Sequence, residues 1–351
     1  RCTRRGLPGG PSFFFSVLCS CGVFFFLLGL QLSLRGAECR DVTVVLVQNN
    51  ADSSKYGEAG YRKDIPVLVS LTEEALALYP DADFVVWPET AVVPPILRYY
   101  NSREDVSRFN AVSSVLGLVV RSRACFIIGN QHVDGDGADC NAALVFDGET
   151  GPLLPPAPEL YIKQHLVPFT ESLPFYPAFR YLYDRAVPDR SFIWKAGNSP
   201  TVFFNRGIAY SVPICFEDTF GSLCARFVRE GALCLFSISN DSWAASSVCQ
   251  RQHLAMSVFR AVENGVPVFR SSASGVTCAI DAEGHIVGEL EGFSGGFLGK
   301  RLAVPIRQRP SPYSLYGDWF AQTELFLLCI LAVWAGIKKT RNLLKEKGQM
   351  E

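Results

Sequence analysis

The sequence lacks an excess of charge of either sign. Its 351 residues include 33 Lys and Arg against 34 Asp and Glu, which gives a formal net charge of -1 at pH 7. Because no global basic field is present, we expect no nucleic-acid partner. The four histidines show no metal-ligand spacing, and no Gly-x-Ser-x-Gly elbow occurs. The sequence therefore predicts no metal, no cofactor and no serine nucleophile of that type.

A paired cysteine framework is also lacking. Twelve cysteines occur, but their spacing indicates no set of disulfides. Cys125, Cys234 and Cys278 lie in apolar, strand-like runs, where a small buried thiol is the usual role. Cys215 is the one cysteine whose surroundings predict chemistry.

Long apolar runs are present at both ends of the chain. Residues 12–34 carry no charged side chain and exceed the roughly 20 residues that a helix needs to span a bilayer. They predict a transmembrane helix within residues 1–38. Residues 319–337 predict a second span, within residues 317–351. An amphipathic helix lying on the membrane is the alternative there, because Glu324 lies near its start.

Basic residues flank the two apolar runs on their outer sides. Arg4 and Arg5 precede the first run, and Lys338 and Lys339 follow the second. The positive-inside rule then places both ends in the cytoplasm and residues 39–316 outside it. The chain begins with Arg rather than Met, which indicates a truncated or wrongly started reading frame.

Short β-branched runs alternate with helical patterns between these ends, which predicts one large α/β domain. Strands are expected at residues 42–48, 84–87, 125–128, 142–146, 208–214, 233–238 and 276–280. Helices are expected at residues 65–78, 107–120, 223–230 and 250–264. In the last helix, Leu254, Val258, Ala261 and Gly265 would form one packing face. Residues 134–139 (DGDGAD) lack the closing Glu of a calcium loop and predict a hairpin turn.

Cys215 closes the apolar run at 208–214 and is followed by Phe216, Glu217 and a helical pattern. A nucleophile at a strand-to-helix turn exposes its side chain and leaves the next backbone N–H for an oxyanion. Taken alone, a cysteine after a strand is more often a core residue.

Two further segments add charged side chains to this picture. Residues 84–89 (FVVWPE) end a strand at Pro88, so Glu89 would lie at the carboxyl edge of the sheet, where ligands collect. Lys163 stands in the mostly uncharged segment 161–174 (YIKQHLVPFTESLP). The alternatives are a surface acid and a lysine that extends to water. Together with Cys215, however, they supply a general base, a cation for the oxyanion and a nucleophile.

The order of these motifs, Glu in WPE, Lys in YIKQHLVPF and Cys in CFE, is similar to that of the nitrilase superfamily. The HLVPF segment followed by Glu171 resembles the apolipoprotein N-acyltransferase family within it. Segments that also resemble this family are residues 239–243 (SNDSW), 252–254 (QHL), 259–265 (FRAVENG) and 270–275 (RSSASG). Within them, His253 could as well be a packing residue, and Arg260 and Glu263, three apart on the expected helix, could simply pair with each other.

The resemblance implies an α/β fold, a nitrilase-like αββα sandwich at residues 39–316, flanked by transmembrane helices. It implies a multi-pass protein of the bacterial cell inner membrane, with its catalytic domain on the periplasmic side, and we expect a monomer. It also implies the partners: a phospholipid acyl donor, an apolipoprotein acceptor modified with diacylglycerol at its N-terminal cysteine, and the membrane.

A ping-pong mechanism follows from the same resemblance, with Glu89, Lys163 and Cys215 as the triad and a Cys215 thioester as its intermediate. Glu171 would support the triad by hydrogen bonding, and Glu217 would help to position the site beside the nucleophile. A membrane-anchored amidase that hydrolyses a C–N bond is the alternative, although a small soluble substrate needs no anchor. A scaffold without activity is a third hypothesis, against which the intact triad argues.

Overall fold

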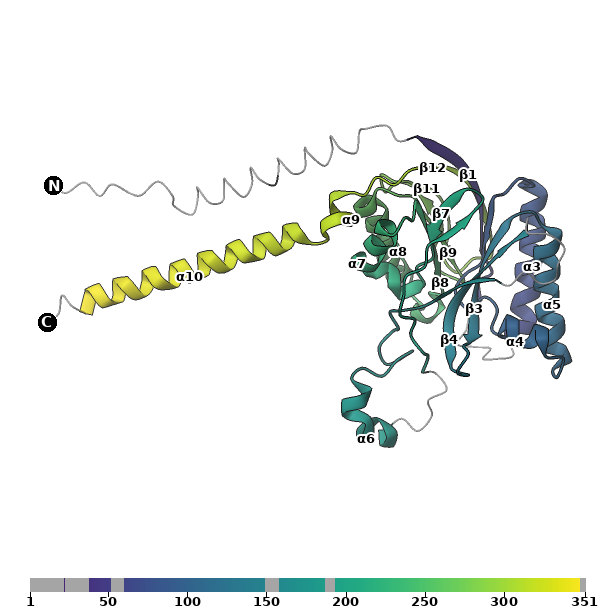
Figure 1. The fold of residues 1–351 in the computed structure, drawn as a ribbon, viewed down its shortest axis with the longest axis horizontal. Helices are drawn as coiled ribbons and strands as arrows, with labels where there is room; N and C mark the ends of the chain where they lie inside the picture. The colour runs from purple at the N-terminus through teal and green to yellow at the C-terminus, as the bar shows by residue number, and fades with distance from the viewer. Residues whose placement is uncertain (1–21, 23–37, 52–59, 149–157, 187–192, 348–351) are drawn as a thin grey trace.

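Figure 1 shows the chain as a computed structural model. The structure describes residues 22, 38–51, 60–148, 158–186 and 193–347. Within these residues the strands form two six-stranded sheets, which lie between two layers of helices. This arrangement confirms the predicted α/β sandwich with two sheets.

The first sheet has the strand order β12-β1-β2-β3-β4-β5. Its strands are β1 (Cys39–Gln48), β2 (Phe84–Val86), β3 (Cys125–Val133), β4 (Asp139–Asp147), β5 (Glu159–Ile162) and β12 (Gly296–Pro305). Strands β1, β2 and β3 run parallel, so their carboxyl ends meet at one edge. Side chains alternate along β1. Val44 and Leu46 join the core between the sheets, whereas Val45 and Val47 join the core beneath the helices.

The second sheet has the strand order β11-β10-β9-β8-β7-β6. Its strands are β6 (Phe203–Asn205), β7 (Ile208–Ser211), β8 (Cys234–Ser239), β9 (Val268–Ser272), β10 (Thr277–Ile280) and β11 (Ile286–Leu290). The core between the sheets is rich in aromatic rings. The Phe84 ring lies 5.2 Å from that of Tyr210 and 4.9 Å from that of Phe236, centroid to centroid. Each such buried ring contributes about 1.5–3 kcal/mol to stability, so this aromatic contact holds the two sheets face to face.

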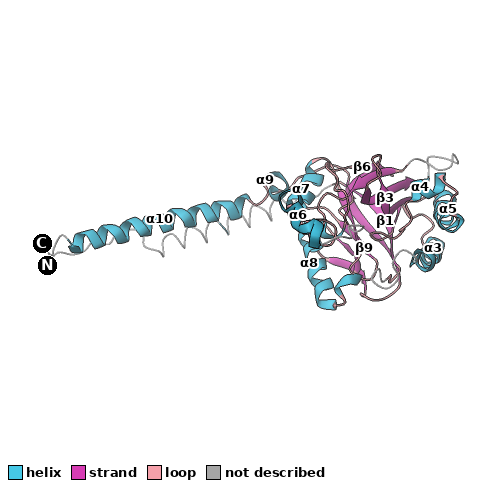
Figure 2. Ribbon diagram, turned by 90° about the horizontal axis from the view of Figure 1, so that it is seen from below, coloured by secondary structure: helices cyan, strands magenta, loops and turns pink. Residues whose placement is uncertain are grey.

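Helices cover the outer faces of both sheets, as Figure 1 and Figure 2 show: α3 and α5 cover the first sheet, and α7 and α8 the second. The helices are α3 (Tyr61–Leu78), α4 (Ile96–Asn101), α5 (Val106–Arg121), α6 (Tyr176–Ala186), α7 (Gly221–Arg229), α8 (Ser247–Asn264), α9 (Pro312–Tyr316) and α10 (Trp319–Lys347). Two short 3-10 helices lie at Cys215–Thr219 and Ser242–Ala244.

The strand expected at residues 208–214 is shorter in the structure, because β7 ends at Ser211. Pro213 has no N–H to donate, which interrupts the ladder. Ile214 then returns to the sheet as a single parallel bridge to Ile238. The chain therefore leaves the sheet directly before Cys215.

The packing face expected of the helix at 250–264 is correct in part. Leu254 and Ala261 are buried against the core, and Val258 packs on it. Gly265 was wrongly included in this face, because it is exposed and ends the helix with a φ of 64°. Only glycine adopts this left-handed conformation at little cost, so Gly265 caps α8.

The acidic segment at 134–139 connects β3 and β4 as a hairpin turn, as predicted. Asp134 Oδ1 accepts hydrogen bonds from the N–H groups of Asp136 and Ala138, each at 2.9 Å. Lys195 Nζ binds the carboxylates of both Asp134 and Asp136. The acidic side chains thus shape the turn and hold a lysine.

Helix α10 extends away from the sandwich as a single rod (Figure 1). Within the described part of the chain it is the one helix that is long and apolar enough to cross a membrane, over Trp319–Asn342, and that window is not buried by the rest of the protein. The run at 12–34 falls outside the described residues, apart from residue 22. The two flanking membrane helices therefore remain an expectation, with one candidate helix found.

Candidate active site

Glu89 lies at the carboxyl edge of the first sheet. The Trp87 N–H still donates to the Ile127 carbonyl at 2.9 Å, and Pro88 then ends the ladder. Any β-carbon at Gly129 of the neighbouring strand would collide with the Pro88 carbonyl. Glycine there lets the Glu89 segment turn closely over β3, with the Glu89 side chain buried.

Lys163 follows β5 and is fully buried. Its Nζ donates to Glu89 Oε1 at 3.0 Å and to Glu171 Oε1 at 2.9 Å. Burial alone would lower the pKa of Lys163, but the negative charges of Glu89 and Glu171 and a thiolate at Cys215 raise it above its usual value. Lys163 is therefore a fixed cation held between two carboxylates.

Asn141 on β4 also joins this cluster, and it was not among the site residues expected from the sequence. Its Nδ2 donates to Glu89 Oε1 at 2.7 Å and to Glu171 Oε1 at 3.2 Å. The Lys163 N–H also donates to the Asn141 carbonyl, because β5 continues beside β4. The one signal in the sequence that could have indicated Asn141 is a polar side chain directly before an apolar run. Asn141 therefore holds both carboxylates in place from a rigid strand.

Cys215 begins the 3-10 helix that links the second sheet to α7, and its φ is 51°. A non-glycine residue in this region carries strain, which is typical of functional sites. The thiol is buried and is electrostatically coupled to Glu89 and Lys163. Burial, and then the negative charge of Glu89, raise the pKa of Cys215 well above its usual value, while Lys163 opposes the shift. Ionisation of the thiol is thus disfavoured, so an attack by Cys215 would require a base to take its proton.

Glu217 lies in the 3-10 helix Cys215–Thr219, which is called the nucleophile turn below because Cys215 is the expected nucleophile. Its side chain joins this turn to the segment that carries Lys163. Its Oε1 accepts from the Tyr161 hydroxyl at 2.8 Å and from the N–H groups of Gln164 and His165 at 2.7 and 3.1 Å. Its Oε2 accepts from the Ile214 N–H at 2.8 Å. Burial raises the pKa of Glu217 to about 7, although these donors favour the carboxylate. The contacts fit the positioning role expected of this residue.

Glu171 and Phe216 complete the set of expected site residues. Glu171 Oε2 accepts from the Val167 N–H at 2.8 Å, which closes the loop around Lys163. The Phe216 ring packs edge-on against Phe220 at 5.0 Å. The backbone N–H of Phe216 has no hydrogen-bond acceptor among the described residues, so it is free to donate to an oxyanion.

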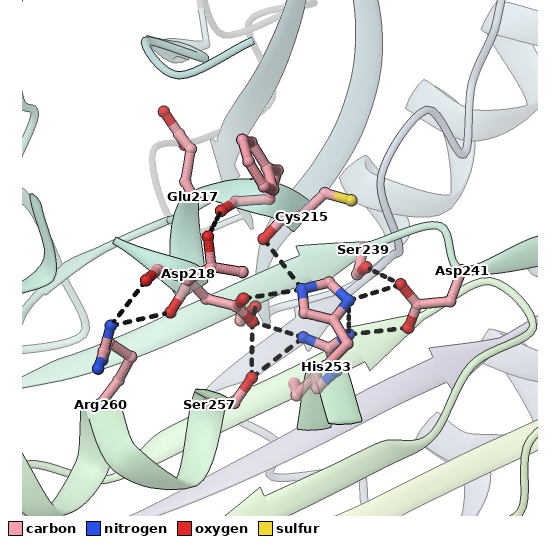
Figure 3. Close-up of polar contacts among 12 residues, drawn as sticks. Cys215, Glu217, Asp218, Ser239, Asp241, His253, Ser257 and Arg260 are labelled. Atoms are coloured by element: carbon pink, nitrogen blue, oxygen red, sulfur yellow. Dashed lines mark hydrogen bonds and ion pairs between the residues drawn. The ribbon is translucent and has the colours of Figure 1, made fainter. Parts of the chain in front are cut away.

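A second polar network lies beneath the nucleophile turn (Figure 3). Asp218 and Asp241 are buried, and Arg270 donates to both, at 2.6 and 2.8 Å. His253 contacts the same two carboxylates, each at 2.8 Å. These contacts were not expected for His253, which could as well have been a packing residue, because the two acids are distant from it along the chain.

Arg260 makes the expected contact and two further ones. It pairs with Glu263, as predicted. It donates in addition to the carbonyls of Asp218 and Thr219, at 3.3 and 3.2 Å. Arg260 therefore supports the carboxyl end of the nucleophile turn, which the spacing on one helix could not indicate.

The site thus combines a buried carboxylate, a fixed cation and a thiol on a strained backbone at the meeting edges of two sheets, which is an arrangement suited to acyl transfer through cysteine. Within the described residues, no group of three or more His, Cys, Asp or Glu side chains is placed to hold a metal ion. The chain belongs to the carbon-nitrogen hydrolase family, whose sequence profile matches residues 46–298.

Relatives named apolipoprotein N-acyltransferase are similar over most of the chain. Apolipoprotein N-acyltransferase 1 of Treponema pallidum (strain Nichols) is 40% identical over 297 residues, which cover 81% of this chain and 54% of that protein. Apolipoprotein N-acyltransferase 1 of Treponema denticola is 34% identical over 338 residues, which cover 90% of this chain and 61% of that protein. The chain therefore spans a little over half the length of these relatives.

Solved structures share the fold at low sequence identity. Nit3 of Saccharomyces cerevisiae, a member of branch 10 of the nitrilase superfamily, has a TM-score of 0.55 at 19% identity and covers 81% of this chain and 94% of its own. An amidase from Nesterenkonia sp. has a TM-score of 0.54 at 16% identity, with 83% and 98% covered. At this identity the likeness concerns the fold alone.

Proposed function

We propose that the chain carries the catalytic domain of an apolipoprotein N-acyltransferase. It transfers a fatty acyl chain from a phospholipid to the α-amino group of the lipidated N-terminal cysteine of an apolipoprotein. The observation that carries this proposal is the similarity over 81% of the chain to a relative of that name. The buried contact of Lys163 with Glu89, beside Cys215, supports the thiol chemistry that the reaction requires.

The first half-reaction acylates the enzyme. Glu89 accepts the thiol proton as Cys215 Sγ attacks the ester carbonyl of the phospholipid. Lys163 and the Phe216 N–H stabilise the negative charge that forms on the carbonyl oxygen. The bond to the glycerol oxygen then breaks, and Glu89 returns the proton to that oxygen. The products are a Cys215 thioester and a lysophospholipid.

The second half-reaction uses the same groups in the reverse order. The neutral α-amine of the apolipoprotein attacks the thioester carbonyl, and the same donors stabilise the oxyanion. Glu89 accepts a proton from the attacking nitrogen and gives it to Cys215 Sγ as the carbon-sulfur bond breaks. An amide is formed and the thiol is restored, without metal or cofactor.

The membrane placement is part of the proposal. Residues 39–316 form the catalytic domain on the periplasmic side of the bacterial inner membrane, and residues 1–38 and 317–351 hold transmembrane helices. The exposed apolar helix at Trp319–Asn342 supports this, together with Lys338 and Lys339 near its end. A membrane-anchored site suits an acyl donor that is itself a lipid. The protein acts as a monomer.

Intact-mass analysis tests the reaction. The chain is purified from membranes in detergent and incubated with a phospholipid of one defined acyl chain, alongside Cys215→Ala and Cys215→Ser. We expect the wild type to gain the mass of one acyl group, which hydroxylamine removes as it cleaves a thioester. Cys215→Ala gains nothing, and any adduct on Cys215→Ser resists hydroxylamine. No adduct on folded wild type would overturn the phospholipid-donor mechanism and favour the amidase.

A further inference from the structure

His253 contacts the nucleophile turn at two points. Its Nε2 lies 2.8 Å from Asp218 Oδ1 and 3.3 Å from the backbone carbonyl oxygen of Cys215 (Figure 3). Its Nδ1 lies 2.8 Å from Asp241 Oδ1. The ring therefore links α8 and the β8 edge to the nucleophile residue itself, through the main chain.

Charged and polar groups surround the ring and leave it little freedom. Two carboxylates, Asp218 and Asp241, contact both the Arg270 guanidinium and the His253 ring. Arg270 Nη2 also lies 3.0 Å from His253 Nδ1. Both acids and Arg270 are buried, so each must keep its partners. The Ser239 hydroxyl donates to Asp241, and the Ser257 hydroxyl donates to Asp218. Breaking any of these contacts would leave a charged group without a partner in the apolar interior, and this cost keeps the network in place.

The Cys215 carbonyl and the Phe216 N–H belong to one peptide unit. Such a unit is planar and trans, so its C=O and N–H point in opposite directions. A donor that holds the carbonyl on one side thus fixes the direction of the N–H on the other. The hydrogen bond to the carbonyl also polarises the amide and strengthens its N–H as a donor.

We propose that His253 is a positioning residue for acyl transfer. Through an Nε2–H shared between Asp218 Oδ1 and the Cys215 carbonyl, it fixes the Cys215–Phe216 peptide and aims the Phe216 N–H at the oxyanion that forms on the substrate. The role rests on the proposed function, in which this N–H stabilises the oxyanion. The contacts of His253 are with the Cys215 carbonyl and two carboxylates rather than with Cys215 Sγ, so it acts through the main chain.

Two reactions of the same thiol separate this role from a general structural one. Acylation by a phospholipid passes through an oxyanion, whereas alkylation of Cys215 by iodoacetamide does not. Both rates are measured at residue 215 by peptide mass spectrometry in wild type, His253→Ala and His253→Gln. His285→Gln is the matched control, because His285 is an exposed histidine far from this network along the chain.

We expect His253→Ala to slow acylation about 100-fold, the usual effect of losing one oxyanion donor, with alkylation within about threefold of wild type. His253→Gln keeps an N–H donor and recovers most of the acylation rate. Unchanged acylation in His253→Ala would overturn the inference, as would an equal fall in both reactions in both variants. If wild type is alkylated but never acylated, the proposed function fails instead.

Discussion

The Tyr161 hydroxyl donates to Glu217 Oε1 at 2.8 Å, and this hydrogen bond joins the two halves of the site. Lys163 lies two residues after Tyr161, and Cys215 lies two residues before Glu217. This buried contact thus sets the Lys163 segment beside the 3-10 helix that begins at the proposed nucleophile, Cys215. We therefore expect Glu217 to act through the positions of other groups rather than on the substrate.

Glu217→Gln is expected to destabilise the protein although it preserves shape. Both carboxylate oxygens accept from donors, and an amide would turn its NH2 toward one of these N–H or O–H groups. We expect a loss of about 1–3 kcal/mol in the free energy of unfolding, measured by chemical denaturation at pH 8, where the Glu217 carboxyl with its pKa of about 7 is ionised. The exposed Glu230→Gln serves as the control. Equal stability of wild type and Glu217→Gln would contradict this role.

Lys163→Met is expected to abolish acylation and to unfold more easily. It leaves Glu89 and Glu171 facing each other without a cation, and removing one partner of a buried ion pair costs about 3–5 kcal/mol. The double variant Lys163→Met/Glu171→Gln removes one of the two charges, so it recovers part of the unfolding free energy but no acylation. Acylation in this double variant at the wild-type rate would show that the cation is not needed for the reaction.

Glu89→Gln is expected to slow acylation and, at the same time, to make the Cys215 thiol easier to ionise. Without a base, acylation falls about 10²–10⁴-fold. The negative charge of Glu89 raises the pKa of Cys215, so its removal lowers that pKa. The pH profile of iodoacetamide alkylation at Cys215 therefore shifts to lower pH in Glu89→Gln. A shift to higher pH would mean that Glu89 does not act on the thiol through its charge.

The free energy of unfolding is expected to fall at alkaline pH, because His253 loses its proton there. Burial and the charge of Arg270 lower the pKa of His253, but Asp218 and Asp241 raise it to about 9 from an ordinary value of 6.5. A raised pKa contributes stability that is complete below pH 6.5 and is lost as pH rises through 9. The loss is about 3 kcal/mol at most, from about 1.4 kcal/mol per pKa unit.

Unfolding of the purified protein from pH 6 to pH 10 measures this contribution. In His253→Gln the alkaline decline that belongs to this group disappears, while His285→Gln keeps the wild-type slope. A wild-type curve that is flat between pH 7 and pH 10 would show that the imidazolium does not stabilise the fold.

Local sequence was sufficient for the main elements of the sandwich. Apolar runs predicted the interior strands β1, β2, β3, β4 and β8, because strands buried on both faces have no polar face. The edge strands β5, β6, β11 and β12 were not predicted, since part of each is exposed and its pattern is weak. The buried strand β9 was not predicted either, because its sequence VFRSS is polar at Arg270 and the two serines. Gly265 was assigned to a packing face because spacing alone does not distinguish a packed glycine from a helix cap.

The sequence by itself determined which side chains we propose for the chemistry. Pro88 stops a strand before Glu89, and Cys215 follows an apolar run that Pro213 interrupts. Both are local consequences of the missing proline N–H, so they can be seen in the order of residues. The resemblance to the apolipoprotein N-acyltransferases predicted roles for Lys163 and Glu171 in the same way, from a short motif.

Only the tertiary structure decided which groups hold these side chains in place. Asn141 reaches two carboxylates from an adjacent strand, and Asp218, Asp241 and Arg270 surround His253 from three separate segments. Such groups are brought together when the two sheets pack, and a buried charge is stable only where the completed fold supplies its partners. That requirement concerns distances in space, which the order of residues along the chain does not contain.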